Sequence, residues 1–268
     1  TMPSGLCSRN TLTADCAGVS NEVECTLNTC CTWCCSDCDQ TPSSLPSTSP
    51  SLSMIPSTGP TAYFGTQHYA MAEIYNATDG DNWVYNVRWG DPDICTYLPG
   101  YYYNVICVNG VLTDLRLLSW NLNGTIPSAI GILTGLLTLR LNTNPLLGGT
   151  IPTEIGLLRD LTTLELRDTA ISGSIPTELG LLSSLKKLHL YNCNLSGPLP
   201  SELGLLSSLN TFWVENNQLT GTIPTELAAL GNSIKLHENS LSGTMPSGLC
   251  SRNTLTADCA GVSNEVEC

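Results

Sequence analysis

One pattern recurs six times between residues 112 and 246, and it limits the possible folds more than any other feature of the chain. Each copy carries LxxLxLxxNxLxGxIP, and the prolines of successive copies lie 25, 24, 24, 24 and 22 residues apart, at Pro127, Pro152, Pro176, Pro200, Pro224 and Pro246. A period in this range is typical of a solenoid, in which no unit can bury its leucines without neighbours. We therefore expect stacked coils whose LxL segments form short strands with the leucines turned inward.

The full pattern LxxLxLxxNxLxGxIPxxLGxL resembles the plant-type extracellular leucine-rich repeat family, which includes receptor-kinase ectodomains and polygalacturonase inhibitors. The preceding stretch, AxxxIYNATDGDNW followed by two cysteines, looks like the N-terminal cap of that family. The resemblance covers about residues 62–268. It implies an α/β-type horseshoe, a leucine-rich repeat solenoid of mostly short parallel β-strands with an irregular or 3-10 convex side and disulfide-rich caps. Residues 62–111 are the cap, and residues 112–246 are the six repeats.

The cap and the coils carry further local signals. We expect a short helix that ends near Asn76 and a hairpin at Asn109-Gly110, because Asn-Gly between two β-rich runs favours a tight turn. Cys95 and Cys107 bracket an aromatic stretch and are the predicted disulfide pair. The asparagine position of the repeat, which bonds buried backbone in the family, is only partly kept: it holds Trp120, Asn144, Thr169, Cys193, Asn217 and Asn239. Cys193 is therefore predicted to be a buried free thiol.

The first 25 residues of the chain are repeated, letter for letter, as residues 244–268. The second copy continues the rhythm of the repeats, whereas the first has no solenoid before it. We interpret residues 1–40 as the Cys-rich C-terminal cap of a preceding unit and residues 247–268 as the start of the next such cap. The chain would then be one link of a series with a 243-residue period, and the two copies should share one conformation. This cap looks similar to those of secreted microalgal repeat proteins.

Fourteen cysteines indicate an oxidising compartment and hence secretion. Crowded cysteines favour disulfides over a zinc site, which usually has two separated ligand pairs, so no metal or other cofactor is expected. Apart from the pair named above, the sequence leaves the partners of the half-cystines open: Cys7, Cys16, Cys25, Cys30, Cys31, Cys34, Cys35, Cys38, Cys250, Cys259 and Cys268. No apolar run is long enough to span a membrane.

Two kinds of glycosylation are predicted. Residues 41–61 are rich in Ser, Thr and Pro, a composition typical of O-glycosylated linkers. The candidate O-linked sites are Thr41, Ser43, Ser44, Ser47, Thr48, Ser49, Ser51, Ser53, Ser57, Thr58 and Thr61. N-glycosylation sequons occur at Asn76, Asn123 and Asn194.

The net charge of −13 argues against nucleic acid as a partner, because phosphate binding requires clustered Lys and Arg. Paired carboxylates, nucleophile elbows and phosphate loops are absent from the sequence, so we expect no catalytic residues and no enzyme. The outward positions of the last three strands gather aromatic and ionisable side chains on the concave face. These residues, which we call the concave patch, are His189, Tyr191, Trp213, Glu215 and His237. Such exposed aromatics could stack on sugars or anchor a partner, although every solenoid must place some side chains there.

These observations lead to one primary interpretation and one alternative. The primary interpretation is a structural subunit of an extracellular glycoprotein fibre, whose partners are copies of itself and its covalent glycans. The alternative is an extracellular binding module that uses the concave face, such as a receptor ectodomain or an inhibitor of wall-degrading enzymes.

Overall fold

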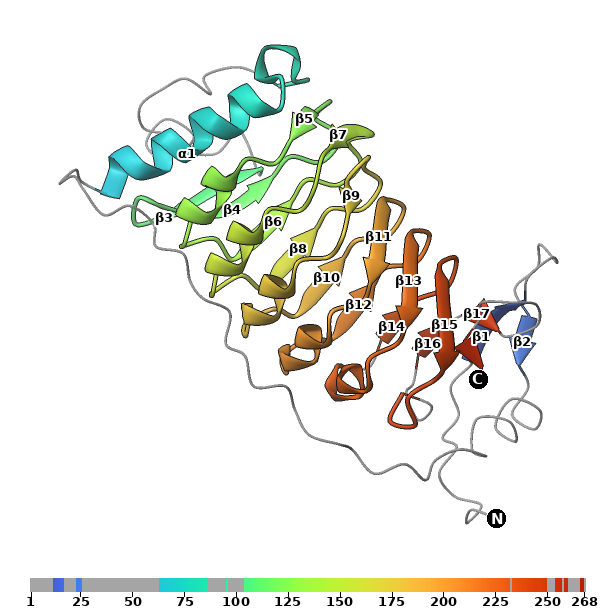
Figure 1. Ribbon diagram of the computed structural model, residues 1–268. Coiled ribbons are helices and arrows are strands. Elements are labelled where there is room, and N and C mark those ends of the chain that lie inside the picture. The colour runs from blue at the N-terminus through green and yellow to red at the C-terminus, as the bar shows by residue number, and fades with distance from the viewer. Residues whose placement is uncertain are drawn as a thin grey trace.

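The computed structural model describes residues 63–85, 95, 104–231 and 233–249, together with the backbone of the short strands 12–16, 23–25, 254–256, 258–259 and 266–267. The predicted solenoid is confirmed. Each coil gives one strand to a long sheet and one strand to a second sheet on the flank, and each of the first five coils adds a 3-10 helix on the remaining side (Figure 1). The predicted Ser/Thr/Pro linker, with all its O-linked candidates, lies outside the described residues, as do the cysteines between residues 26 and 40.

The long sheet has eight strands, and every pair is parallel except β3 with β4. Its inward positions are in register from coil to coil: Leu115, Leu139, Leu164, Leu188, Phe212 and Ile234. The strands are β3 (Val105–Val108), β4 (Val111–Arg116), β6 (Thr138–Arg140), β8 (Thr163–Glu165), β10 (Lys187–His189), β12 (Thr211–Trp213), β14 (Ser233–Lys235) and β16 (Thr254–Thr256). The last of these belongs to the duplicated segment, so the sheet continues beyond residue 246.

The flank sheet is interrupted once. Strands β5 (Asn123–Thr125) and β7 (Leu146–Gly148) form a pair of their own, separate from a five-stranded part. That part contains β9 (Ser172–Gly173), β11 (Asn194–Pro198), β13 (Gln218–Thr222), β15 (Ser240–Thr244) and β18 (Val266–Glu267). The interruption lies where the second coil carries an extra residue in its Leu-Leu-Gly-Gly sequence, and isolated bridges cross it. The insertion therefore disturbs the ladder locally.

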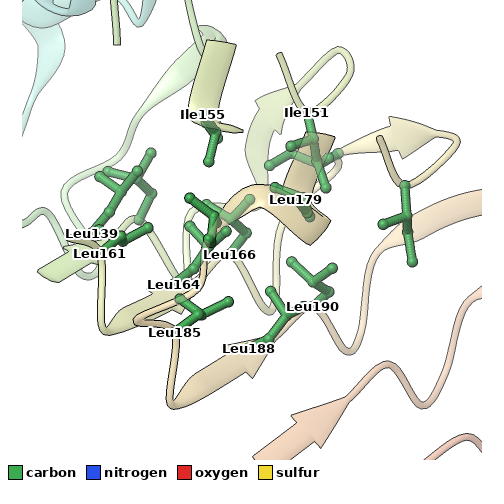
Figure 2. Packing of buried hydrophobic residues seen from close by; sticks show 14 of the residues in the cluster. Leu139, Ile151, Ile155, Leu161, Leu164, Leu166, Leu179, Leu185, Leu188 and Leu190 are labelled. Atoms are coloured by element: carbon green, nitrogen blue, oxygen red, sulfur yellow. The ribbon is translucent and has the colours of Figure 1, made fainter. Parts of the chain in front are cut away.

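A proline precedes the 3-10 helix of each coil between residues 112 and 230. The five helices are η2 (Ser128–Ile132), η3 (Thr153–Leu157), η4 (Thr177–Leu181), η5 (Ser201–Leu205) and η6 (Thr225–Ala229). Proline suits this position because its fixed φ fits the turn and no ladder hydrogen bond is required of it. The helices, together with the two sheets, surround a continuous core of leucine and isoleucine (Figure 2). Burying one such side chain contributes about 2 kcal/mol.

Asparagine side chains at the turns after β6, β12 and β14 satisfy buried backbone groups of the coil before them. Asn144 is fully buried. Its amide donates to the carbonyls of Leu117 and Leu141, and its oxygen accepts from the N–H groups of Trp120 and Leu122. Asn217 and Asn239 repeat this arrangement further along the stack. Because each asparagine serves the preceding coil, the first coil does not need one, and Trp120 occupies that position.

The N-terminal cap covers the first coil. It comprises α1 (Tyr63–Ala77) and η1 (Gly80–Asn82), and Trp83 packs edge-on against both Tyr75 and Trp120. The side chain of Gln67 donates to the carbonyl of Gly110 and accepts from the N–H of Leu112. The disulfide Cys95–Cys107 is present, which confirms the predicted pair. The hairpin is also confirmed, with positive φ at Asn109 and Gly110.

The two identical copies pair differently, so the shared conformation that the fibre interpretation predicts is not found in this single chain. In the first copy, β1 (Leu12–Cys16) and β2 (Val23–Cys25) form an antiparallel hairpin. In the second copy, the corresponding β16 and β18 join the long sheet and the flank sheet, respectively, each parallel to the coil before. Residues 244–268 directly follow a coil that offers both sheets, so their strands can extend the stack.

The hydrogen bonds of the buried Asn144 side chain predict a large loss of stability for Asn144→Ala. The substitution would leave several buried backbone groups without partners, each costing about 1–3 kcal/mol, so we expect a loss of roughly 3 kcal/mol or more in the free energy of unfolding. Urea denaturation followed by circular dichroism measures it. Asn210→Ala, at an exposed asparagine, is the matched control and should change stability by less than about 0.5 kcal/mol. Equal losses in both variants would contradict this role for Asn144.

Candidate functional site

The structure brings the concave patch together on three neighbouring coils. His189 ends β10 and Trp213 ends β12, and the two residues are directly paired in the parallel register. Lys235 takes the next position along this row, at the end of β14. Tyr191, Glu215 and His237 follow their strands by two residues. The close strand spacing of a parallel sheet therefore forces these large side chains against one another.

Trp213 is held between two neighbours. The imidazole of His189 stacks on the indole with ring centroids 4.2 Å apart and an interplanar angle of 3°. Lys235, from the strand on the other side, places its Nζ 4.2 Å from the indole centroid. The indole Nε1 donates to Ser233 Oγ at 3.0 Å. The expectation of a free aromatic face for stacking on sugar is therefore not met at Trp213, because both faces of the ring are covered.

Tyr191 completes the aromatic group, and its ring centroid lies 6.1 Å from those of both His189 and Trp213. The guanidinium of Arg167 lies 5.4 Å from the tyrosine ring centroid, in the range of a cation–π contact. Burial raises the pKa of the Tyr191 phenol. The hydroxyl therefore stays protonated near neutral pH and can act as a hydrogen-bond donor.

The histidine of the stack is a neutral group at physiological pH. Burial lowers the pKa of His189 to about 4, and the charge of Lys187 adds to the effect, followed by Arg167, Lys235 and Arg140. Its Nε2 lies 3.1 Å from Thr211 Oγ1. The ring therefore contributes shape and a hydrogen bond, but no positive charge.

Glu215 is the least satisfied group of the patch. It is only 8% exposed, and burial raises the pKa of its carboxyl. Lys235 Nζ lies 3.7 Å from Glu215 Oε1, while Oε2 is buried without a hydrogen-bond partner. A buried carboxylate oxygen without a partner is costly, so this atom is a polar group available to a ligand donor.

Basic side chains extend the same face beyond the patch. Glu165 is buried and lies 3.5 Å from Arg140 and 3.9 Å from Lys187. Half of the chain's ten Lys and Arg residues are on the solvent side of the long sheet: Arg116, Arg140, Arg167, Lys187 and Lys235. The sequence-based patch omitted Lys235 and Lys187. The first residues of strands β10, β12 and β14 also face outward, and they are Lys187, Thr211 and Ser233. Including these positions in the sequence pattern could have revealed the residues that contact the patch.

The three sequon asparagines are exposed. Asn123 and Asn194 flank the buried leucines Leu122 and Leu195 in the flank sheet, and strand alternation therefore directs both asparagines outward. Asn76 lies near the end of α1. All three positions are accessible to a glycan, and glycosylation itself remains a prediction.

Cys193 is a free, buried thiol, as predicted. Its Sγ donates to the carbonyl of Leu166 at 3.4 Å and lies 3.3 Å from Thr169 Oγ1. Burial raises the pKa of this thiol, which keeps it protonated. Within the described residues, no three His, Cys, Asp or Glu side chains are grouped to hold a metal ion.

Comparisons with known proteins identify the architecture. The Leucine Rich Repeat family model matches residues 184–206 and 208–230. A chain in the BIR3–SERK2 complex from Arabidopsis thaliana is 30% identical, with a TM-score of 0.52; the match covers 65% of this chain and 94% of that one. This chain belongs to the leucine-rich repeat family.

Two further leucine-rich repeat structures are similar. A plant ice-binding protein is 28% identical, with a TM-score of 0.62, and the match covers 72% of this chain and 63% of that one. The ectodomain of the Arabidopsis thaliana receptor kinase GASSHO1/SCHENGEN3, solved in complex with CASPARIAN STRIP INTEGRITY FACTOR 2, is 28% identical, with a TM-score of 0.58. That match covers 72% of this chain but 26% of the ectodomain. No curated protein sequence matches this chain.

The chain is thus a leucine-rich repeat module of the kind found in plant receptor ectodomains. The described part of the chain contains no helix with the length and apolar character needed to cross a bilayer.

The buried His189 of the stack predicts that the free energy of unfolding depends on pH, and His189→Gln should remove this dependence. Between about pH 6.5 and pH 4 the unfolded imidazole takes up a proton that the folded one does not, so the wild type loses stability as the pH falls, by up to about 1 kcal/mol per pH unit. Urea unfolding at pH 7.0, 5.5 and 4.5 measures this slope.

Thr211→Val is the control, because it removes the hydrogen-bond partner but keeps the imidazole. It should retain most of the wild-type slope. An unchanged slope in His189→Gln would refute the assignment of this pH dependence to the stack.

Proposed function

We propose that this chain is a structural subunit of an extracellular glycoprotein fibre built from leucine-rich repeat units. The observation that carries the proposal is the pair of identical 25-residue segments, 243 residues apart. The second of them contributes strands to both sheets of the solenoid. An identical segment that recurs 243 residues further along the chain is what successive units of one tandem series would contain.

The shape of the unit supports this function. The coils stack along one axis, and the two ends of this stack differ here. The N-terminal end is closed by α1 and the Cys95–Cys107 disulfide. The C-terminal end instead continues into the strands of the duplicated segment. Units with two different ends associate head to tail, which produces open filaments when rotation does not close a ring.

Glycosylation and secretion are part of the proposal. The exposed sequons, the Ser/Thr/Pro composition of residues 41–61 and the cysteine content all support a sugar-coated extracellular protein. The extracellular ectodomains among its relatives support the same location.

Electron microscopy of the native secreted material tests the proposal. We expect filaments with an axial repeat set by one unit, and a mass that falls on enzymatic deglycosylation. Comparing the denatured, reduced and deglycosylated mass with the 28.6 kDa of this chain shows whether units are joined by peptide bonds. Compact particles of one chain each, with no filaments, would overturn the fibre.

A binding module is the second candidate, favoured by the preorganised concave patch with its unpartnered Glu215 oxygen. In this case a partner would contact the exposed edges of the aromatic group. Tyr191→Ala should then weaken binding about tenfold or more, as expected for an aromatic anchor. The measurement is binding of the secreted chain to an array of extracellular peptides and glycans. Ser207→Ala, on the opposite side of the coil, is the control, and equal binding by both variants would count against this candidate.

A further inference from the structure

We propose that the C-terminal edge of the solenoid is a docking edge for residues 12–16 of a second copy of this chain. The proposal rests on the fibre function above and specifies how successive subunits would join. The N-terminal strands β1 and β2 lie at the C-terminal end of the stack, far from α1 (Figure 1). There β1 pairs in parallel with β17 (Asp258–Cys259).

The register of this contact is specific. Asp15 lies opposite Asp258 and Cys16 opposite Cys259, so each residue meets its own duplicate. Strand β17 forms a three-stranded sheet with β1 and β2, and along the chain it follows β16, the last strand of the long sheet, so β1 docks in parallel beside the segment that ends the stack. The edge of the duplicated segment thus accepts its own sequence as the next strand.

The contact can form between copies as well as within one chain. Residues 26–62 connect the β1–β2 hairpin to the helix at the opposite end of the stack and could reach about 120 Å if extended. The eight strands of the long sheet span only about 34 Å at their usual spacing. The connection therefore does not oblige β1 to dock on its own chain, and exchange of an identical element between protomers is a low-cost route to assembly.

Each chain has one donor strand and one acceptor edge, at β1 and β17. Exchange therefore joins the donor of one copy to the acceptor of the next. An open row of copies keeps a free donor strand at one end and a free acceptor edge at the other. The hairpin partner β2 covers the other side of β1 through the pairs Leu12–Cys25, Thr13–Glu24 and Ala14–Val23. The donor thus docks as a two-stranded unit whose own edge is shielded.

The register also predicts which substitution strengthens assembly. Like charges opposite one another on neighbouring strands are destabilising, and this register places two aspartates in that relation. Asp15→Asn should therefore tighten the association by about two- to fivefold. Glu24→Gln makes the same change in net charge opposite Thr13 rather than an acid, and it should have no such effect.

The decisive experiment measures assembly mass by light scattering and sedimentation velocity on the intact secreted chain. Asp15→Pro removes a backbone donor from β1 and should weaken assembly by about tenfold; Ser20→Pro, outside the strands, should not. A chain lacking residues 1–25 can accept a donor but cannot supply one. Added in equimolar amount, it should act as a terminator and shorten the assemblies of the full chain.

The outcomes separate this inference from the fibre proposal. If native material is filamentous but Asp15→Pro and the truncated chain assemble as the wild type does, strand addition is wrong and the fibre stands. If native material shows no filaments but the full chain still associates through β1 and loses this with Asp15→Pro, the docking edge stands and the fibre fails. A wild-type chain that stays monomeric at every concentration overturns the docking edge.

Discussion

The stability of every coil depends on groups supplied by the next coil. Leucines of one coil are buried only when the neighbouring coil covers them, and in three coils the turn after the strand is satisfied by an asparagine one coil further on, as Asn144 does for Trp120 and Leu122. This dependence gives the stack a direction. The first coil receives its bonds from the second and covers its open side with Trp83 of the cap. The same dependence accounts for the pairing of the second copy, whose strands extend both sheets of the coil before it.

Much of the fold followed from the sequence because it is encoded locally. The LxL spacing fixes which side chains face inward, Asn109-Gly110 specifies the hairpin, and Cys95 and Cys107 are close along the chain. The pairing of the first copy did not follow, since the sequence of residues 1–25 contains no information about which neighbours it will meet. Sequence identity predicts an identical structure only when the surroundings are also identical.

The candidate site was predicted as a set of positions, but its chemistry was not. The repeat period and the strand alternation predicted that His189, Trp213 and Glu215 lie together on the concave face. The same pattern predicted that the aromatic rings are open surfaces. Rows on adjacent strands are close enough for an imidazole and an ammonium group to cover both faces of an indole. Burial then holds His189 neutral and leaves Glu215 with a raised pKa. These properties depend on side-chain conformation and on desolvation, which a one-dimensional pattern does not contain. The relatives share the architecture and differ in what they bind, so the function of this chain has to be sought on its own surfaces.

The interruption of the flank sheet has a mechanical consequence. Between β7 and β9 the flank has no continuous ladder and is crossed by isolated bridges and by the bonds of the Ala170 and Ser172 N–H groups to the carbonyls of Leu147 and Gly149, while the long sheet runs through the same level without a break. A rod that is continuous along one side and interrupted along the other bends most easily at the interruption. The bend is directed toward or away from the interrupted side. In a filament of such units, this compliance would recur once in every unit. The extra residue in the Leu-Leu-Gly-Gly sequence would thus set both the spacing and the direction of the points at which the filament flexes.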